Sequence, residues 1–283
     1  MKILVYGSTG FVGRYVVRQL LNKAELFLAV RDEQKAKDIF DGKVNTIKLK
    51  NNIGDEILDI IPDVVINLIG ILRETSENTF EKVHYEIPKR LIDVSKQVGV
   101  KKFIQMSALG ANLNSKSRYQ KTKAMAEEYL KKSGLDYVIF RPSIIMGKEQ
   151  KLFDDLKKYS KIAPFFLAPC DAKVQPVNVY DVATCFEKAS LSEIKNQIFE
   201  LCGNKVVNYK ELFEFALNYL GIKRPVIGVP KKMFLFMIPV FAIIPEPIMT
   251  LDQYYMLEED NVCKGSYPGV KDLVGSVSDA FVF

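Results

Sequence analysis

The chain has few of the residues from which metal sites and disulfide frameworks are built. Among its 283 residues there is one histidine, His84, and there are only four cysteines: Cys170, Cys185, Cys202 and Cys263. No two cysteines form a CxxC pair and no histidine stands near them, so the pattern predicts neither a metal site nor a disulfide framework. Such cysteine usage is typical of a reducing compartment, and we expect a cytoplasmic protein.

Long uninterrupted apolar runs are also missing. The apolar run at residues 1–7 is too short for the core of a secretory signal and lacks a small-residue cleavage site. The stretch over residues 233–249 contains Pro239, Pro245 and Pro247, whereas a membrane-spanning helix needs about 20 uninterrupted apolar residues. We expect that stretch to be either core of its own lobe or a patch that faces a partner or a membrane surface.

Charge of one sign is not concentrated in any part of the sequence. The net charge of +6 comes from 40 basic and 34 acidic residues, which stand in mixed runs such as Lys148–Lys158. A nucleic-acid-binding protein would more often gather lysine and arginine on one face among aromatic residues, so we expect no nucleic acid among the partners. With 48% hydrophobic and 26% charged residues, the composition is that of a folded globular chain.

Short apolar runs alternate with segments of helical spacing in the first half of the chain. Continuous apolar runs suit strands that are buried on both faces, and they stand at residues 3–6, 26–30, 44–49, 64–69, 103–106 and 137–140. Between them lie helical patterns such as Val12, Val16 and Leu20. This alternation predicts an α/β fold with right-handed crossovers, in which a doubly wound parallel Rossmann sheet is joined by a smaller C-terminal lobe.

The regular alternation of strand and helix patterns ends at about Pro142, after which prolines and longer irregular links become frequent. We expect a dinucleotide-binding Rossmann domain over residues 1–150, with residues 175–202 returning to its sheet. A smaller substrate or partner lobe is expected over residues 151–283.

Local signals in the second half predict three elements. Residues 179–191 have the spacing of a helix, and residues 198–201 form a strand-like run. Asn208 with Glu211 three positions later is a capping-box signature, which predicts a helix that continues to about Leu220 before Gly221.

A glycine-rich turn joins the first predicted strand to the first predicted helix. Gly7 permits a tight turn, Gly10 lets the backbone approach a diphosphate, and Gly13 lets the helix lie close on the sheet. The helix amino terminus adds unpaired N–H groups and the positive end of its dipole. We predict that the turn binds the diphosphate of a pyridine nucleotide through Gly7, Thr9, Gly10, Phe11, Val12 and Gly13; the alternative is a turn whose glycines serve packing only.

The end of the second strand bears on cofactor choice. Arg31 lies close to where NAD-binding proteins place an acidic residue on the ribose, and a guanidinium there suits a 2′-phosphate. Asp32 keeps NAD(H) as the alternative, so NADP(H) is favoured over NAD(H). Leu68, Ile69 and Gly70, at the exit of the fourth strand, are predicted to flank the adenine, because ligands bind beyond the carboxyl ends of parallel strands.

Tyr119 and Lys123 stand four residues apart in a predicted helix over residues 117–132, so they share one face. An ammonium beside a phenol favours the phenolate and lowers the phenol pKa, which suits proton exchange with a carbonyl or carbinol. Ser107, at the end of the fifth strand, is placed to hydrogen-bond the same oxygen. The Tyr-x-x-x-Lys pattern also occurs by chance at Tyr85 and Tyr219, but only Tyr119 follows a strand-terminal serine.

These residues together resemble the short-chain dehydrogenase/reductase superfamily, to which NAD-dependent epimerases and dehydratases also belong. More closely, the chain resembles the NAD(P)H-binding accessory subunits of respiratory complex I and their bacterial relatives, an atypical branch of that superfamily. The segments that carry this likeness are residues 10–17, 65–70, 117–119, 175–177 and 250–253.

The resemblance implies a bound NADP(H) whose nicotinamide lies near Tyr119 and Lys123. It implies that Pro142, Ile144 and Ile145 line the carboxamide side, and that the cofactor mainly stabilises the subunit. His84 departs from the pattern, because many members with intact chemistry have an asparagine in this part of the fourth helix. The departure weakens the case for a full proton relay; the alternative is a histidine satisfied within its helix.

Three functions remain open on the sequence. The first is an NADP(H)-holding accessory or scaffold subunit linked to respiratory complex I or quinone metabolism, peripheral at the inner face of the membrane. The second is an active NAD(P)-dependent reductase, or an enzyme of the sugar-nucleotide epimerase type, that uses Ser107, Tyr119 and Lys123 as catalytic residues on a small-molecule substrate. The third is a redox sensor that changes partner with cofactor occupancy.

Overall fold

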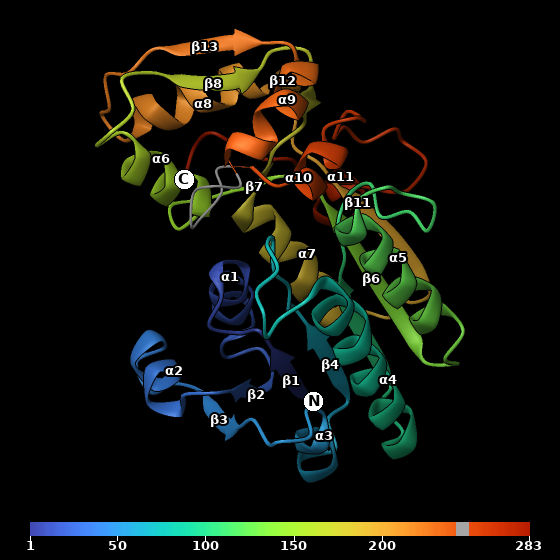
Figure 1. Cartoon of the computed structure of the whole chain (residues 1–283). Helices are drawn as coiled ribbons and strands as arrows, with labels where there is room; N and C mark the ends of the chain where they lie inside the picture. Colours follow the sequence, from blue (N-terminus) through green and yellow to red (C-terminus); the bar gives the residue numbers. More distant parts are fainter. Residues whose placement is uncertain (242–248) are drawn as a thin grey trace.

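Seven parallel strands form the main sheet in the order β11-β6-β5-β4-β1-β2-β3 (Figure 1). The computed structural model describes residues 1–241 and 249–283. Each pair of neighbouring strands is in parallel register, as in Ile3 opposite Val64 and Leu26. The strand bounds are β1 Lys2–Tyr6, β2 Glu25–Val30, β3 Asn45–Lys48, β4 Val64–Asn67, β5 Lys102–Met106, β6 Asp136–Pro142 and β11 Gln197–Leu201. The predicted doubly wound α/β sheet is therefore confirmed.

Helices cover both faces of this sheet (Figure 1). Successive side chains of a strand point to opposite faces, so Ile3 and Val5 pack on one side while Leu4 and Tyr6 pack on the other. The first face is covered by α1 (Phe11–Leu20), α2 (Glu33–Ile39), α7 (Val179–Leu191) and α11 (Val270–Val274). The second face is covered by α3 (Asp55–Ile60), α4 (Ile87–Val98) and α5 (Arg118–Lys131). Burying each large aliphatic side chain contributes about 1.5–3 kcal/mol, which favours this two-sided arrangement.

A second, smaller core lies above the carboxyl end of the sheet in the view of Figure 1. It is built on the parallel pair β8 (Phe166–Pro169) and β13 (Val226–Val229), with α6 (Lys151–Tyr159) and α8 (Tyr209–Tyr219). Asn208 and Glu211 form the predicted capping box: the Asn208 side chain accepts from the Glu211 N–H at 2.9 Å, and the Glu211 carboxylate accepts from the Asn208 N–H at 2.7 Å.

The remaining elements are short. They are η1, a π-helix over Lys82–Glu86, and the strands β7 (Ile145–Met146), β9 (Lys173–Val174), β10 (Val177–Asn178) and β12 (Val207–Asn208). Helices α9 (Lys231–Phe241) and α10 (Leu251–Met256) complete the second half. Among the residues that the structure describes, no helix is long and apolar enough to cross a membrane. Of the apolar stretch 233–249, α9 covers the first part and residues 242–248 lie outside the described residues.

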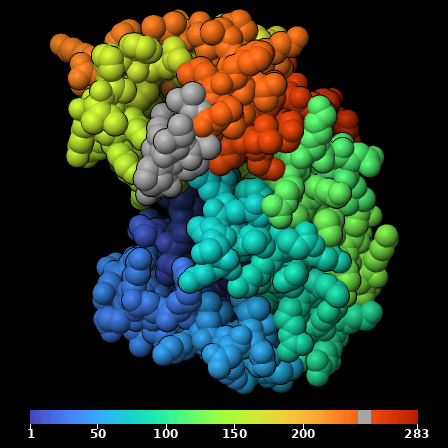
Figure 2. All heavy atoms as spheres, in the orientation of Figure 1, coloured from blue at the N-terminus to red at the C-terminus, as the bar shows by residue number. Residues whose placement is uncertain are grey.

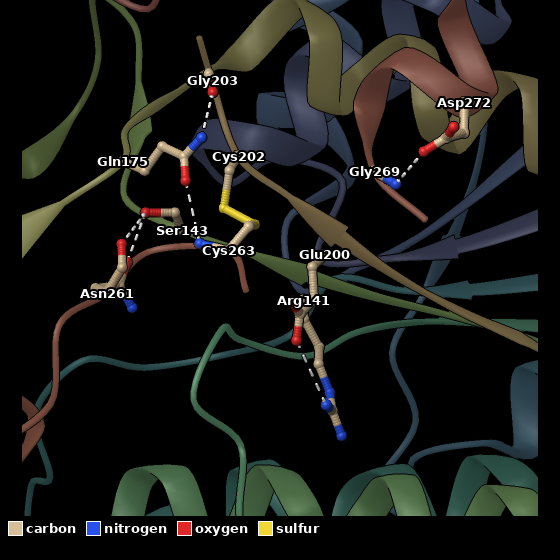
Figure 3. Close-up of a disulfide and its surroundings, with 10 residues drawn as sticks. All are labelled: Arg141, Ser143, Gln175, Glu200, Cys202, Gly203, Asn261, Cys263, Gly269 and Asp272. Carbon is tan, nitrogen blue, oxygen red and sulfur yellow. Dashed lines mark hydrogen bonds and ion pairs between the residues drawn. A yellow bond between two sulfur atoms is a disulfide. The ribbon is translucent and has the colours of Figure 1, made fainter. Parts of the chain in front are cut away.

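The expectation that the cysteines stay unpaired is wrong. Cys202, which follows β11, and Cys263 form a disulfide with their Cα atoms 6.1 Å apart (Figure 3). The side chain of Gln175 lies beside it, accepts a hydrogen bond from the Cys263 N–H at 3.1 Å and donates to the Gly203 carbonyl at 2.7 Å. The two cysteines are 61 positions apart, so only the tertiary structure brings them together.

Candidate cofactor-binding site

The glycine turn after β1 is held in a shape that other residues would block. Gly7 has φ +78°, and a Cβ built on it would lie 2.9 Å from the backbone carbonyl carbon of Leu68. A Cβ on Gly13 would lie only 2.2 Å from the Gly7 carbonyl oxygen. Both positions therefore require glycine, because the clashing atoms are backbone and cannot move aside.

The turn leaves polar groups without partners. Ser8 is fully buried, and its hydroxyl has no hydrogen-bond partner within the part of the chain that the structure describes. Gly10 is the N-cap residue of α1 and provides no side-chain cap for the first N–H groups. Buried polar groups are normally satisfied, and a helix amino terminus favours an anion. A diphosphate fits this combination of donors and open backbone.

The other predicted turn residues have different surroundings. Thr9 accepts a hydrogen bond on its carbonyl oxygen from Arg14 Nε at 3.0 Å, so a guanidinium is held beside the turn. Phe11 lies against Gly147, where an added Cβ would meet its ring at 2.9 Å, and Val12 belongs to the main core. Sequence reasoning missed Arg14, although its charge directly after the third glycine was a visible signal.

Arg31 and Asp32 are both exposed at the end of β2, but their side chains have different roles. Asp32 is the N-cap residue of α2 and accepts a hydrogen bond from the Lys35 N–H at 3.0 Å. An N-cap carboxylate is stabilised by the helix dipole, so Asp32 is committed to its own helix. Arg31 lies at the carboxyl end of β2, where the sequence analysis expected the 2′-phosphate.

The exit of β4 passes close to the glycine turn and to α5. Leu68 donates its N–H to the Tyr6 carbonyl at 3.0 Å, which fixes this exit beside β1. Ile69 donates to the Asn67 side chain at 3.1 Å. At Gly70 an added Cβ would lie 3.3 Å from Lys123 Nζ, so the glycine leaves room for this ammonium. The predicted adenine-side and nicotinamide-side residues therefore follow one continuous edge of the sheet.

Tyr119, Lys123 and Ser107 are brought together, but not in the expected way. Lys123 Nζ lies 6.0 Å from the centre of the Tyr119 ring and donates to the Met106 carbonyl at 3.2 Å. The Ser107 hydroxyl donates to the carboxylate of Glu127 rather than to the oxygen of Tyr119. The serine is thus turned toward a buried acid that the sequence analysis did not consider.

The expected lowering of the Tyr119 pKa is wrong. Burial, together with the negative charge of Asp252, raises the pKa of Tyr119 to about 12. Burial also lowers the pKa of Lys123 to about 8, against the opposing effect of Glu127. Both shifts favour the neutral forms, because desolvation penalises a phenolate and an ammonium alike.

Glu127 is the centre of a buried ionic cluster behind Ser107. Its side chain is 1% exposed and accepts two close hydrogen bonds from Arg141, at 2.6 and 3.0 Å. Arg141 in turn lies 5.1 Å from the centre of the Tyr267 ring. A bidentate guanidinium compensates the burial of the carboxylate, so this cluster holds Ser107 firmly in its place.

The segment predicted to line the carboxamide side runs directly beside Ser107. The Pro142 carbonyl accepts from the Leu109 N–H at 2.9 Å, and Ser143 donates its hydroxyl to the Asn261 side chain at 2.5 Å. Ile144 and Ile145 continue from it into β7, and the Ile144 carbonyl accepts from the Val177 N–H at 2.9 Å. Asn261 and the disulfide thus lie next to this side of the site (Figure 3).

The surface is hollowed between the second core and the main sheet. In the space-filling view a hollow separates the yellow-green α6 region of the lobe from the blue α2 region, and dark blue amino-terminal atoms are visible inside it (Figure 2). A separate shallow pocket after β3 is lined by Asn51, Asn52, Ile53 and Arg90 of α4.

Comparison with known proteins shows the family to which the chain belongs. Residues 7–160, more than half of the chain, match the family model described as NAD(P)H-binding. The chain belongs to this NAD(P)H-binding family. The match begins at the first glycine of the turn and includes Arg31, Gly70, Tyr119 and Lys123. As a member of the NAD(P)H-binding family, the protein binds a nicotinamide cofactor, as predicted.

Curated relatives share most of the length of this NAD(P)H-binding chain. The NADH dehydrogenase [ubiquinone] 1 alpha subcomplex subunit 9 of Arabidopsis thaliana is 29% identical over 95% of the chain and 72% of the relative. The NADH-ubiquinone oxidoreductase 40 kDa subunit of Neurospora crassa is 29% identical over 95% of the chain and 74% of the relative. The predicted likeness to accessory subunits of complex I is therefore confirmed.

A solved structure shows the same fold. The NADPH-dependent quinone oxidoreductase of Escherichia coli, solved in complex with NADPH, superposes with a TM-score of 0.75 at 16% identity. It covers 99% of this NAD(P)H-binding chain and 97% of its own. At this identity the likeness establishes the fold of the whole chain, including the second half that the family model does not reach.

Both ring nitrogens of His84 have partners within the protein, as the alternative given in the sequence analysis predicted. Its Nε2 accepts a hydrogen bond from the Ile71 N–H at 3.0 Å, and its Nδ1 lies 3.4 Å from the Thr122 hydroxyl. Burial and the neighbouring Lys123 lower the pKa of His84 to about 2. The neutral ring therefore ties the exit of β4 to α5.

His84 makes the stability of the fold sensitive to acid. Its pKa is lower in the folded protein than the ordinary 6.5, so the unfolded chain binds the proton first and stability falls as the pH drops below 6.5. Between pH 6.5 and pH 5 the free energy of unfolding falls by about 2 kcal/mol for this reason. We predict that His84→Gln lowers stability at pH 7 but loses less of it on going to pH 5. Urea unfolding of both proteins at the two pH values tests this; equal losses would contradict it.

Proposed function

We propose that this protein is an NADP(H)-holding accessory subunit that docks to a respiratory complex of the NADH:ubiquinone type at the inner face of the membrane. The observation that carries the proposal is the state of the nicotinamide end of the site, where Tyr119 is buried, its pKa is raised and Ser107 is bonded to Glu127. The names of the relatives, which are subunits of such complexes, support the docking part.

Holding rather than turnover follows from the surroundings of Tyr119. A proton-transferring tyrosine needs a pKa near the working pH and an open path to substrate. Here the ring is 9% exposed and packs with Phe80 and Ala108, while Met256 of α10 lies against the same cluster. Such a site suits a cofactor that contributes binding energy to the fold, because a ligand that binds only the native state stabilises it.

NADP(H) is the cofactor that we propose over NAD(H). Arg31 is exposed at the end of β2, whereas the Asp32 carboxylate accepts the Lys35 N–H and is engaged in capping α2. A guanidinium forms strong charge-assisted hydrogen bonds to a phosphate, and NAD(H) has no phosphate at this place. The fold neighbour from Escherichia coli was likewise solved with NADPH.

We predict that Arg31→Leu weakens NADPH binding about 30-fold and changes NADH binding less than about threefold, since a charge-assisted hydrogen bond contributes about 1.5–3 kcal/mol. Lys35→Leu, a charge removal of the same size one helical turn away, is the matched control and should affect NADPH only weakly. Isothermal titration calorimetry of the wild type and both variants with both cofactors measures the six affinities. If Arg31→Leu weakened both cofactors equally, the assignment to the 2′-phosphate would be wrong.

The docking surface that we propose is the outer side of α9. Phe236 is 80% exposed there, and Met233 and Leu235, near Lys232, are about half exposed. Exposed apolar side chains that lie together on one helix are typical of a partner interface. The proposed partner is a subunit of the respiratory complex, in keeping with the relatives.

Purification from native membranes tests the whole proposal. The tagged chain, extracted in a mild detergent, is expected to carry NADP(H) and to bring down subunits of a respiratory complex. Phe236→Asp should keep the cofactor and lose the complex. Recovery of a cofactor-bound monomer without any other subunit would contradict the proposed docking to a respiratory complex. NADPH consumption is also measured with a supplied carbonyl, sugar nucleotide or quinone. If the wild type consumed NADPH and Tyr119→Phe did not, at unchanged NADPH affinity, the protein would be an enzyme and not a cofactor-holding subunit.

A further inference from the structure

A residue far along the chain holds the first turn of α5. Asp252, in α10, accepts hydrogen bonds from the Ser117 hydroxyl at 2.9 Å, the Arg118 N–H at 2.5 Å and the Tyr119 N–H at 3.4 Å. The first N–H groups of a helix have no partners within the helix, and a carboxylate there is favoured by the dipole. Asp252 thus fixes the start of the helix that carries Tyr119 and Lys123.

The same short helix touches both the cofactor site and α9. On one side Met256 packs against the cluster of Phe80, Ala108 and Tyr119. On the other side the buried side chain of Tyr254 packs with Phe234 of α9 in a separate cluster. α10 therefore lies between the nicotinamide end of the site and the helix whose outer side is exposed.

Glu258, just beyond α10, links this helix to the segment before α5 and to the start of α9. Its carboxylate accepts from Lys116, which precedes α5, at 3.0 Å, and its carbonyl accepts from Lys231, the first residue of α9, at 3.0 Å. Both bonds are exposed and weak on their own. The two bonds show, however, that the segment directly after α10 contacts both the start of α5 and the start of α9.

We infer that α10 couples cofactor binding to the order of α9, with Asp252 as the positioning residue that transmits it. A cofactor that rests on Tyr119 and Lys123 orders the first turn of α5, Asp252 then holds α10 in place, and Tyr254 holds α9. The inference rests on the proposed function, because it names how the same cofactor regulates the docking surface. By thermodynamic reciprocity, a partner that binds α9 raises the NADP(H) affinity by the same factor.

Hydrogen exchange read by mass spectrometry, with and without NADPH, tests the coupling on the full chain. In the wild type NADPH is expected to slow exchange in the glycine turn, in α5 and, by about threefold, in residues 231–239 of α9. In Asp252→Asn, whose amide nitrogen cannot accept the same N–H groups, NADPH should still protect the glycine turn but no longer α9.

Asp171→Ala is the control, because Asp171 accepts the Lys231 N–H at 2.6 Å and so caps α9 itself, and alanine has no acceptor for that N–H. This variant should speed exchange in α9 with and without NADPH while leaving their ratio unchanged. Met256→Ala, which keeps Asp252 but removes the contact with the Tyr119 cluster, gives an independent test if Asp252→Asn folds poorly. It too should lose the response of α9.

The outcomes separate the inference from the proposed function. If NADPH protected the glycine turn and α5 of the wild type but not α9, the coupling would be wrong while cofactor holding stood. If the response of α9 survived in both Asp252→Asn and Met256→Ala, the path through α10 would be wrong. If NADPH protected no segment of the folded wild type, the cofactor-holding function itself would fall.

Discussion

Gly13→Ala is expected to reduce NADPH affinity at least about 100-fold, which corresponds to about 2.7 kcal/mol of binding free energy. The added Cβ would lie 2.2 Å from the Gly7 carbonyl oxygen and 2.7 Å from that of Ser8. Because both atoms are backbone of the turn, the methyl group can fit only if the turn moves away from the helix. The N–H groups that we propose to face the diphosphate would move with it. Isothermal titration calorimetry on the folded variant measures the loss.

Gly221→Ala is the matched control for this substitution. Gly221 has φ +67° at the end of α8, and a Cβ there would meet no atom within 4 Å. The left-handed conformation costs an alanine about 1 kcal/mol of stability, but the position is remote from the glycine turn. This variant should therefore be less stable and bind NADPH normally. If Gly13→Ala bound NADPH within threefold of the wild type, the turn would not be the diphosphate site.

Removal of the Cys202–Cys263 disulfide is expected to lower the free energy of unfolding by about 4 kcal/mol and the melting temperature by about 10 °C. The two cysteines are 61 positions apart, so the bond removes much of the freedom of the unfolded chain. The paired substitution Cys202→Ala with Cys263→Ala, and the reduced wild type, should show the same loss in thermal unfolding.

Cys170→Ala provides the control, because Cys170 is exposed and unpaired in the structure. Substitutions at such a surface position change stability by less than about 0.5 kcal/mol. Equal melting temperatures of oxidised and reduced wild type would contradict the predicted stabilisation. Structural disulfides persist mainly in oxidising compartments, so alkylation of the cysteines during cell lysis would also report where the protein folds.

The main sheet was predictable because its signals are local and repeated. The central strands β1 and β4 are short apolar runs, and the glycine turn stands between such a run and a helical pattern, which is where the fold needs it. The capping box of α8 was equally visible, since Asn208 and Glu211 contact each other three positions apart. Interactions over three or four positions depend little on the rest of the chain.

The chemistry around Tyr119 was not predictable in the same way. Sequence spacing placed Lys123 beside Tyr119 correctly, but it could not show that the ring is buried or that Asp252 lies close. Nor could it show that Ser107 faces Glu127 and Arg141. The pKa of a side chain depends on burial and on charges from distant segments, so a correct motif gave the wrong direction for the pKa shift of the tyrosine.

The sequence by itself determined the parallel sheet and the glycine turn, because periodicity, turn glycines and helix caps act between near neighbours along the chain. It also predicted the strand ends at which we propose that the nicotinamide cofactor binds. Only the tertiary structure decided that Cys202 meets Cys263, that Asp252 caps α5 and that the pKa of Tyr119 is raised. These contacts join residues 61 to 135 positions apart. Their energies arise when packing excludes water and brings distant groups within bonding distance, and no local pattern records this.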